Sequence, residues 1–124
     1  MKTIEFNPNG EALKVSFKFS GFLLASYTYT LWEAESNHKV VYEKGNNQNP
    51  QDDTYQLPMP LKANDGRLIQ LRTEFIAQDP SNVKNYTIST EVYQGSNLLG
   101  TAKDEGNNTG SAQSSLIFIK MKKL

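Results

Sequence analysis

Hydrophobic and polar side chains alternate along most of this chain. Leu13, Val15 and Phe17 are separated by Lys14 and Ser16, and the same period of two returns in most later segments. Because successive side chains of a β-strand point to opposite faces of the sheet, this pattern predicts strands with one buried face. The period of 3.6 residues that marks an amphipathic helix is nearly absent. The predicted strands lie at 13–19, 26–31, 38–44, 54–57, 69–77, 86–92, 98–103 and 114–122.

Turn-forming residues separate these strands. Short clusters of Gly, Asn, Asp, Ser and Pro lie at 9–10, 20–21, 65–66, 79–82 and 95–97. Short strands joined by such turns predict an all-β fold: an antiparallel β-sandwich, immunoglobulin-like or C2-like, of seven to eight strands, with a small barrel as the alternative. The length of 124 residues fits one sandwich domain that spans residues 1–124.

The last predicted strand differs from the others because residues 116–119 are apolar on both faces. One face of a strand in a sandwich lies in the core, so the other face, with Leu116 and Phe118, needs a second cover. We expect the long segment 45–66, which carries several apolar side chains, to fold across that face. The alternative is contact with a second molecule, which would make the chain a weak homo-oligomer through 114–122 rather than a monomer.

Composition excludes several classes of chemistry. The 13 basic and 13 acidic residues cancel to a net charge of zero, which argues against nucleic acid as a partner. The chain has no cysteine, so disulfides, thiolate nucleophiles and cysteine-ligated metals are excluded. Its one histidine, His38, follows a turn-like segment, and no Gly-x-Ser-x-Gly elbow is present, so a Ser-His-acid triad is not indicated. We expect no cofactor.

Glu33 and Glu35 are the only pair of carboxylates with a spacing suited to catalysis. Two positions apart on a regular strand, they would share a face at a separation of about 7 Å, which glycosidases use. A solvated strand end explains the same two residues without a cleft. We therefore expect that the chain is not an enzyme, and a carboxylate-based, glycosidase-like activity is the least favoured function.

Calcium is the metal that the polar loops at 45–53, 79–82 and 104–110 could hold, because they offer carboxylate and amide oxygens. If residues 54–57 cross the sheet as a strand, all three loops emerge at one end of the sandwich; otherwise they are divided between the two ends. The sequence lacks EF-hand spacing, and Asn and Asp also fill ordinary turns, so we expect solvated loops. The candidate ligands are Asp52, Asp53, Asp79, Asp104 and Glu105.

Trp32 is the candidate ligand-binding residue. Strict alternation from Tyr27 and Tyr29 places it on the polar face of its strand, where an exposed indole would form a platform for a carbohydrate or a peptide. A β-bulge near Leu31 would instead return Trp32 to the core, and this is the arrangement that we expect.

These observations favour a non-catalytic binding or protein-interaction module for an unknown protein or small ligand. The alternative is a structural subunit of a homo-oligomeric assembly, or a calcium- or carbohydrate-binding module. Each apolar run falls short of the ~18 residues that a membrane span needs, and residues 1–10 lack the apolar core of a signal peptide. We therefore expect a cytoplasmic protein without a membrane partner.

Overall fold

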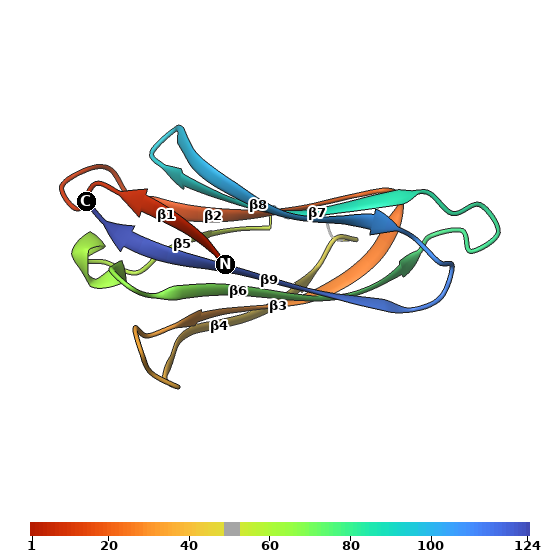
Figure 1. Cartoon of the computed structure of the whole chain (residues 1–124), viewed down its shortest axis with the longest axis horizontal. Helices are drawn as coiled ribbons and strands as arrows, with labels where there is room; N and C mark the ends of the chain where they lie inside the picture. Colours follow the sequence, from red (N-terminus) through yellow and green to blue (C-terminus); the bar gives the residue numbers. More distant parts are fainter. Residues whose placement is uncertain (49–52) are drawn as a thin grey trace.

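The computed structural model describes residues 1–48 and 53–124 of the chain. Within them the strands form two packed sheets (Figure 1), which confirms the predicted all-β sandwich. The elements are β1 (Lys2–Phe6), β2 (Leu13–Ser20), β3 (Leu23–Trp32), β4 (Lys39–Asn46), β5 (Thr54–Gln56), the 3-10 helix η1 (Leu61–Asn64), β6 (Leu68–Ala77), β7 (Asn85–Gln94), β8 (Asn97–Asn107) and β9 (Gln113–Lys123).

The five-stranded sheet has the strand order β1-β9-β6-β3-β4, and the four-stranded sheet has the order β5-β2-β7-β8. Neighbouring strands are antiparallel except β1 and β9, which run parallel. Both sheets keep open edges, so the barrel alternative is wrong. The alternation did not predict β1, because Ile4 and Phe6 are the only two side chains of its five residues that are buried.

Aromatic rings fill the middle of the core. The ring centroid of Phe17 lies 5.3 Å from those of Tyr27 and Tyr29, and the Tyr55 ring lies 5.2 Å from Tyr29. Tilted and edge-on contacts of this kind suit the charge distribution of aromatic rings. Burial raises the pKa of the Tyr27 and Tyr29 hydroxyls, because ionisation would leave a charged oxygen in apolar surroundings.

The segment 45–66 does not cover the last strand. It leaves the five-stranded sheet after β4 and joins the four-stranded sheet as β5, which pairs with β2. Leu57 and Leu61 are buried in the core, whereas Met59 is 64% exposed. The prediction that this segment folds across Leu116 is therefore wrong, because the space between the two sheets buries its leucines. Leu116 stays 50% exposed.

A β-bulge is present near Leu31, but it lies in β4. Leu31 pairs with Val41 and Trp32 pairs with Lys39, which leaves Val40 as the extra residue. The pairing of β3 with β6 stays in register through Trp32. A bulge redirects side chains in the strand that holds the extra residue, so Trp32 keeps its outward direction and is half-buried there. The prediction that Trp32 joins the core is wrong.

Within residues 1–48 and 53–124, no helix has the length and apolar character needed to cross a membrane.

Candidate binding surface

Apolar side chains gather on the face of the five-stranded sheet that points away from the core. Leu24 of β3, Tyr42 of β4 and Leu116 of β9 are 42%, 49% and 50% exposed. Trp32 and Phe118 are half-buried on the same face. We call this surface the outer face; its residues are Leu24, Ser26, Thr28, Thr30, Trp32, Lys39, Tyr42, Lys44, Leu68, Gln70, Arg72, Glu74, Ser114, Leu116, Phe118 and Lys120.

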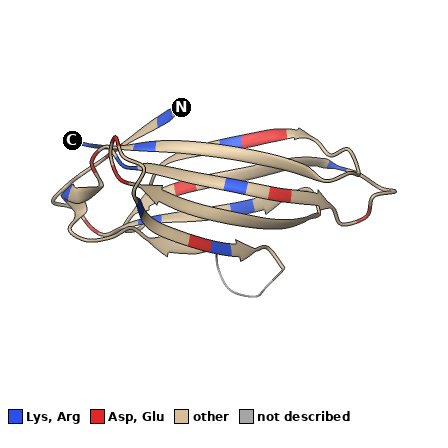
Figure 2. Ribbon diagram, turned by 90° about the horizontal axis from the view of Figure 1, so that it is seen from below, with Lys and Arg blue, Asp and Glu red and all other residues tan. Residues whose placement is uncertain are grey.

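Two aromatic rings at the β3–β4 side of the outer face are held by lysines. The Lys39 ammonium lies 4.5 Å from the centre of the Tyr42 ring and 5.7 Å from that of Trp32. Lys44 lies 5.8 Å from the Tyr42 ring. A cation above an aromatic face is attracted to its negative potential, so these contacts order both rings. Figure 2 shows residues of both charge signs along the strands. On the outer face itself positive charge predominates, with Lys39, Lys44, Arg72 and Lys120 against Glu74.

Gln70 connects the aromatic side of the outer face with its apolar side. Its side-chain oxygen accepts a hydrogen bond of 2.9 Å from the Trp32 indole nitrogen. In the strand register Gln70 lies between Thr30 of β3 and Phe118 of β9. Thr30 is almost fully buried although it points outward, because its neighbours cover it. The outer face is therefore an ordered surface that runs from Trp32 to Phe118.

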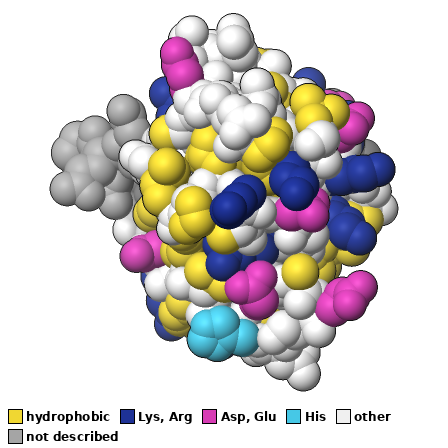
Figure 3. Space-filling view, turned by 90° about the vertical axis from the view of Figure 1, so that its left-hand side faces the viewer, with side chains coloured by type: hydrophobic (Ala, Val, Ile, Leu, Met, Phe, Trp, Pro, Cys, Tyr) yellow, Lys and Arg dark blue, Asp and Glu magenta, His cyan; other side chains and the backbone are white. Residues whose placement is uncertain are grey.

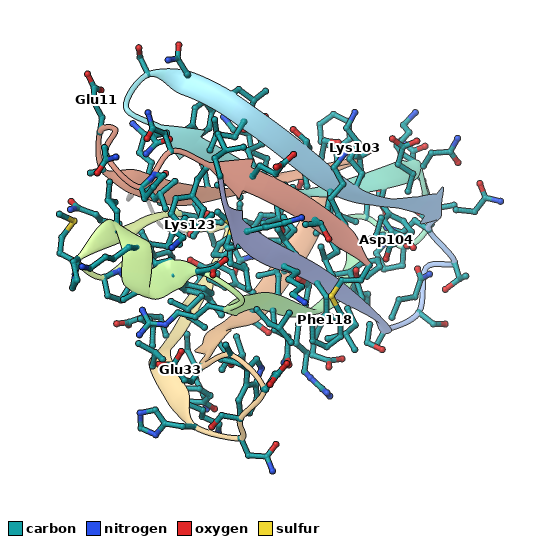
Figure 4. The ribbon with its side chains drawn as sticks, turned by 60° about the vertical axis from the view of Figure 1, so that its left-hand side comes forward. Glu11, Glu33, Lys103, Asp104, Phe118 and Lys123 are labelled. Atoms are coloured by element: carbon teal, nitrogen blue, oxygen red, sulfur yellow. The ribbon has the colours of Figure 1, made fainter. Side chains whose placement is uncertain are left out.

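A groove of about 540 Å³ adjoins the outer face at the open side of the sandwich, between β8 and β9. Figure 4 shows Lys103 and Asp104 of β8 on the same side of the molecule as Phe118 of β9. The groove thus combines charged side chains with apolar ones. Its lining residues are Lys2, Thr101, Ala102, Lys103, Asp104, Leu116, Ile117 and Phe118.

The backbone N–H and C=O groups of β9 point alternately toward β6 and toward β1. Met121 donates its N–H to the Arg67 carbonyl at 2.9 Å and accepts the Gly66 N–H at 2.8 Å, on the side of β6. Leu124 donates its N–H to the Phe6 carbonyl at 3.0 Å, on the side of β1. Successive residues of a strand direct these groups to opposite sides. Odd-numbered residues of β9 therefore bond toward β6, and even-numbered ones point toward β1.

β1 pairs with only part of β9 and so provides hydrogen-bond partners for only some of its backbone groups. It pairs only with residues 119–123, and no described residue pairs with 113–118 on that side. The N–H and C=O groups of Ser114 and Leu116 therefore point to an open edge. Unpaired backbone groups on a sheet edge are a template for a further strand. The groove beside β8 lies at this same edge.

Glu33 and Glu35 do not share a face of a strand. β3 ends at Trp32, so both glutamates lie in the turn that follows, and Glu35 has a φ of +50°. The expectation that they share a strand face is therefore wrong. The Arg67 side chain donates to both Glu33 carboxylate oxygens, at 3.2 and 3.0 Å, and to Asn64 Oδ1 at 3.1 Å. These bonds hold the pKa of Glu33 below its ordinary value, whereas a general acid needs a raised pKa.

Two of the candidate calcium ligands, Asp53 and Asp79, make hydrogen bonds to different neighbours. The Asp53 carboxylate accepts a hydrogen bond of 2.8 Å from the Tyr27 hydroxyl. The Asp79 carboxylate accepts hydrogen bonds from the backbone N–H of Ser81 at 3.1 Å and from the Ser81 hydroxyl at 2.7 Å. The bonds from Ser81 lower the pKa of Asp79. Asp52 lies outside the described residues. Within the part of the chain that the structure describes, no three carboxylates or imidazoles come together as a metal site.

Asp104 and Glu105 belong to β8 rather than to a loop, so the predicted loop at 104–110 begins too early. As neighbours on a strand they point to opposite faces. The Asp104 carboxylate lies near the Tyr86 hydroxyl and contributes, after burial, to the raised pKa of that tyrosine. A shared role of the two carboxylates as cation ligands is therefore not supported by their directions.

His38 lies on the surface, as expected for a histidine at the start of a strand. It is exposed, and Figure 3 shows the single histidine at the rim of the end of the sandwich. Its backbone N–H donates to the Ser36 hydroxyl at 3.0 Å, which closes the turn before β4.

The alternation of hydrophobic residues did not reveal the groove or the open half of β9. Both depend on the parallel pairing of β1 with β9, which covers only residues 119–123. The sequence contains two signals for this site: residues 116–119 are apolar on both faces, and segment 113–118 has neither a charge nor a proline.

The fold is similar to that of solved structures. A DUF4425 family protein from Bacteroides ovatus ATCC 8483 superposes with a TM-score of 0.53 at 12% sequence identity, over 90% of this chain and 96% of that chain. A domain of unknown function, DUF4425, from Bacteroides vulgatus ATCC 8482 gives a TM-score of 0.44 at 9% identity, over 93% and 98%. The first similarity shows a common fold alone. No protein-family model matches the sequence, and no curated protein is significantly similar to it.

Proposed function

We propose that this chain is a non-catalytic protein-interaction module that binds its partner through the outer face and the adjoining edge of β9. The observation that carries the proposal is the exposure of Tyr42 and Leu116 on one sheet face, beside the ordered Trp32 ring. A sheet face that only meets water is ordinarily polar, so exposed apolar and aromatic side chains on such a face favour an interaction site.

The rigidity of this surface supports the same function. The outer face consists of strand residues, and the hydrogen bond from Trp32 to Gln70 fixes one of its aromatic rings before any partner arrives. Side chains that are already ordered lose little conformational entropy on binding. Tyr and Trp are also the residues that most often supply binding energy in protein interfaces.

The state of Glu33 supports a non-catalytic role. Its ion pair with Arg67 fastens the turn after β3 to the residue that precedes β6. A carboxylate that is held ionised in this way has a structural task and is a poor proton donor. Glu33, one member of the candidate catalytic pair, therefore serves the scaffold in this proposal.

The test uses two matched double variants. Tyr42→Ser with Leu116→Ser removes apolar surface from the outer face, and Tyr93→Ser with Leu98→Ser removes it from the opposite face of the sandwich, where Leu98 is 51% exposed. A partner is first captured by a photo-crosslinker at position 116 and then purified. Isothermal titration with the purified partner should show binding weakened about tenfold or more by the first variant alone.

Equal binding by both variants and the native chain would refute the proposal. If the captured partner is a second copy of this chain, light scattering will show a dimer that the first variant dissociates. That result would replace the interaction module with a subunit of a homo-oligomeric assembly.

A further inference from the structure

We propose that β9 binds an extended segment of a partner protein as an additional strand, alongside residues 113–118 and in line with β1. This inference rests on the proposed function and names its mode of recognition. The partner segment carries apolar side chains on the side of Leu116 and Phe118, and a carboxylate on the side that faces the groove.

The backbone of β9 provides the first argument. Ser114 and Leu116 direct N–H and C=O groups to this edge, and Phe118 adds its N–H, because the described pairing of β1 with β9 covers only residues 119–123. A strand placed in line with β1 would continue a ladder that already exists on this edge. Main-chain hydrogen bonds of this kind supply affinity in strand addition, and side-chain pockets supply specificity.

Two other edges of the sandwich, β4 and β8, provide the second argument, because they carry features that discourage added strands. β4 has a bulge at Val40 and charged residues at Glu43 and Lys44. β8 has a register shift and three consecutive charged residues, at 103–105. Such bulges and charges protect sheet edges from pairing. Residues 113–118 have an uninterrupted register with β6 and no charged side chain, so this edge is left receptive.

The packing of β1 against β8 shows where the side chains of an added strand would lie. A Cβ atom at Gly100 would approach Ile4 Cδ1 to 2.9 Å, so Gly100 leaves the space that Ile4 fills. On the inward side of β8 the row that begins with Gly100 continues with Ala102 and Asp104, which line the groove. Inward side chains of an added strand would therefore enter the groove over these residues.

The charges of the groove select the partner. Lys2 is the cation on the inner side of the groove, because its Cε would lie 3.8 Å from a Cβ atom at Gly100. Lys103 alternates with Ala102 and Asp104 along β8 and points to the other face of that strand. An inward carboxylate placed beside Lys2 and away from Asp104 would complement the Lys2 charge, and an inward lysine at that position would be repelled by it. On the outward side, Leu116 and Phe118 offer apolar surface to alternate residues of the added strand.

The probe is a capped, dye-labelled peptide of seven residues with valine at positions 1, 3, 5 and 7 and with threonine, glutamate and threonine between them. Fluorescence anisotropy should detect binding to the native chain. A peptide with lysine in place of the glutamate should bind more weakly. A peptide with N-methyl groups on its three central amides should not bind, because it cannot donate hydrogen bonds to β9.

Two variants with matched exposure locate the site. Leu116→Lys places a charge beside the edge and should weaken peptide binding about tenfold or more, through loss of apolar contact. Leu98→Lys, at the opposite face, should leave the affinity within about twofold. Hydrogen exchange followed by NMR should show that the peptide protects the amides of Ser114, Leu116 and Phe118 in the native chain.

Several results would overturn the inference. These are an absence of peptide binding, binding that Leu116→Lys leaves intact, protection of β8 amides instead, or dimerisation of the chain through residues 113–118 without peptide. If the peptides fail while the outer-face double variant still weakens the purified partner, strand addition is wrong and the proposed function stands. If that variant also has no effect, both are wrong.

Discussion

The two outward faces of the sandwich differ in the contacts and the polarity of their side chains. On the four-stranded sheet, Lys18 lies 3.7 Å from the Glu91 carboxylate and Lys14 lies 5.6 Å from the centre of the Tyr93 ring. Serine and threonine occupy most of the remaining outward positions of β2 and β7. The outer face of the five-stranded sheet instead presents Tyr42 and Leu116 to solvent.

The sandwich architecture does not impose this difference. Both sheets bury one face in the same core, and either could have an entirely polar exterior. Leu98 is the large exposed apolar residue of β8 on the opposite face, whereas the outer face exposes Leu24, Tyr42 and Leu116. Of these three residues, Leu116 lies in the half of β9 that β1 does not pair with. The proposed binding surface thus differs from the opposite face, because it combines an exposed leucine with backbone groups that have no partner among the described residues.

The largest expected loss of unfolding free energy comes from the core, and a smaller one comes from the outer face. Phe17 is buried among three aromatic rings, so Phe17→Ala should lower the free energy of unfolding by about 3–5 kcal/mol. Trp32 is half-buried and keeps one side-chain hydrogen bond, so Trp32→Ala should cost about 1–2 kcal/mol. Urea denaturation measures both. Equal losses of unfolding free energy for the two variants would show that Trp32 is packed as a core residue.

A second variant lowers stability without touching either face. Arg67→Met leaves the buried Asn64 side chain without a donor to its oxygen, which should cost about 1–3 kcal/mol. Partner and peptide binding should be unchanged, because Glu33, Asn64 and Arg67 lie outside the outer face. A loss of binding that follows this loss of stability would show that the binding assays report folding rather than a surface.

The same variant predicts a change in acid stability. The pKa of Glu33 is lower in the folded chain than its ordinary value of 4.5, because Arg67 bonds to its ionised form. The resulting stabilisation is present above pH 4.5 and is lost as the pH falls through the lower folded-state pKa. Unfolding free energies measured between pH 2 and pH 6 should therefore fall less steeply for Arg67→Met than for the native chain. Parallel curves would contradict this role of the ion pair.

Smaller effects on stability are expected from the matched leucines. Leu116→Lys and Leu98→Lys, both about half exposed, should each change the free energy of unfolding by no more than about 0.5 kcal/mol. Only the first should change binding. A large loss of stability for Leu116→Lys would mean that its side chain is packed within the monomer.

The smallest effect concerns the lysines of the two faces. Lys18→Gln removes an exposed ion pair and Lys39→Gln removes a cation from two aromatic rings, and each should cost at most about 0.5–1 kcal/mol. The effect of Lys18→Gln should disappear in high salt, since screening already weakens that pair. A salt-resistant loss at Lys18 would show that the opposite face is more than a solvated surface.

Hydrophobic alternation predicted the sandwich because it reports which residues of a single strand face the core. It placed Tyr27, Tyr29 and Leu31 on the buried side correctly. It could not locate the bulge, because the extra residue, Val40, belongs to the neighbouring strand and depends on pairing. Pairing between distant strands is set by turn geometry and packing together, which no single-strand pattern contains.

The candidate site was predictable only in part. The two-sided apolar character of residues 116–119 indicated that β9 needed a second cover, and Leu116 is indeed uncovered within the described chain. The expected cover failed because the leucines of segment 45–66 gain more by entering the core, where Leu57 is 1% exposed. The free edge depended on β1, whose parallel pairing with β9 has no local signature in the sequence.

Hydrogen exchange of individual β9 amides in dilute, isolated protein tests the central claim most directly. The amides of Ser114 and Leu116 should exchange at rates close to those of exposed amides, while those of Ser115 and Ile117, which bond toward β6, should be strongly protected. This alternation would show a strand that is bonded on one side and free on the other. Strong protection of Leu116 in the monomer would mean that the edge is already occupied, and would contradict the account.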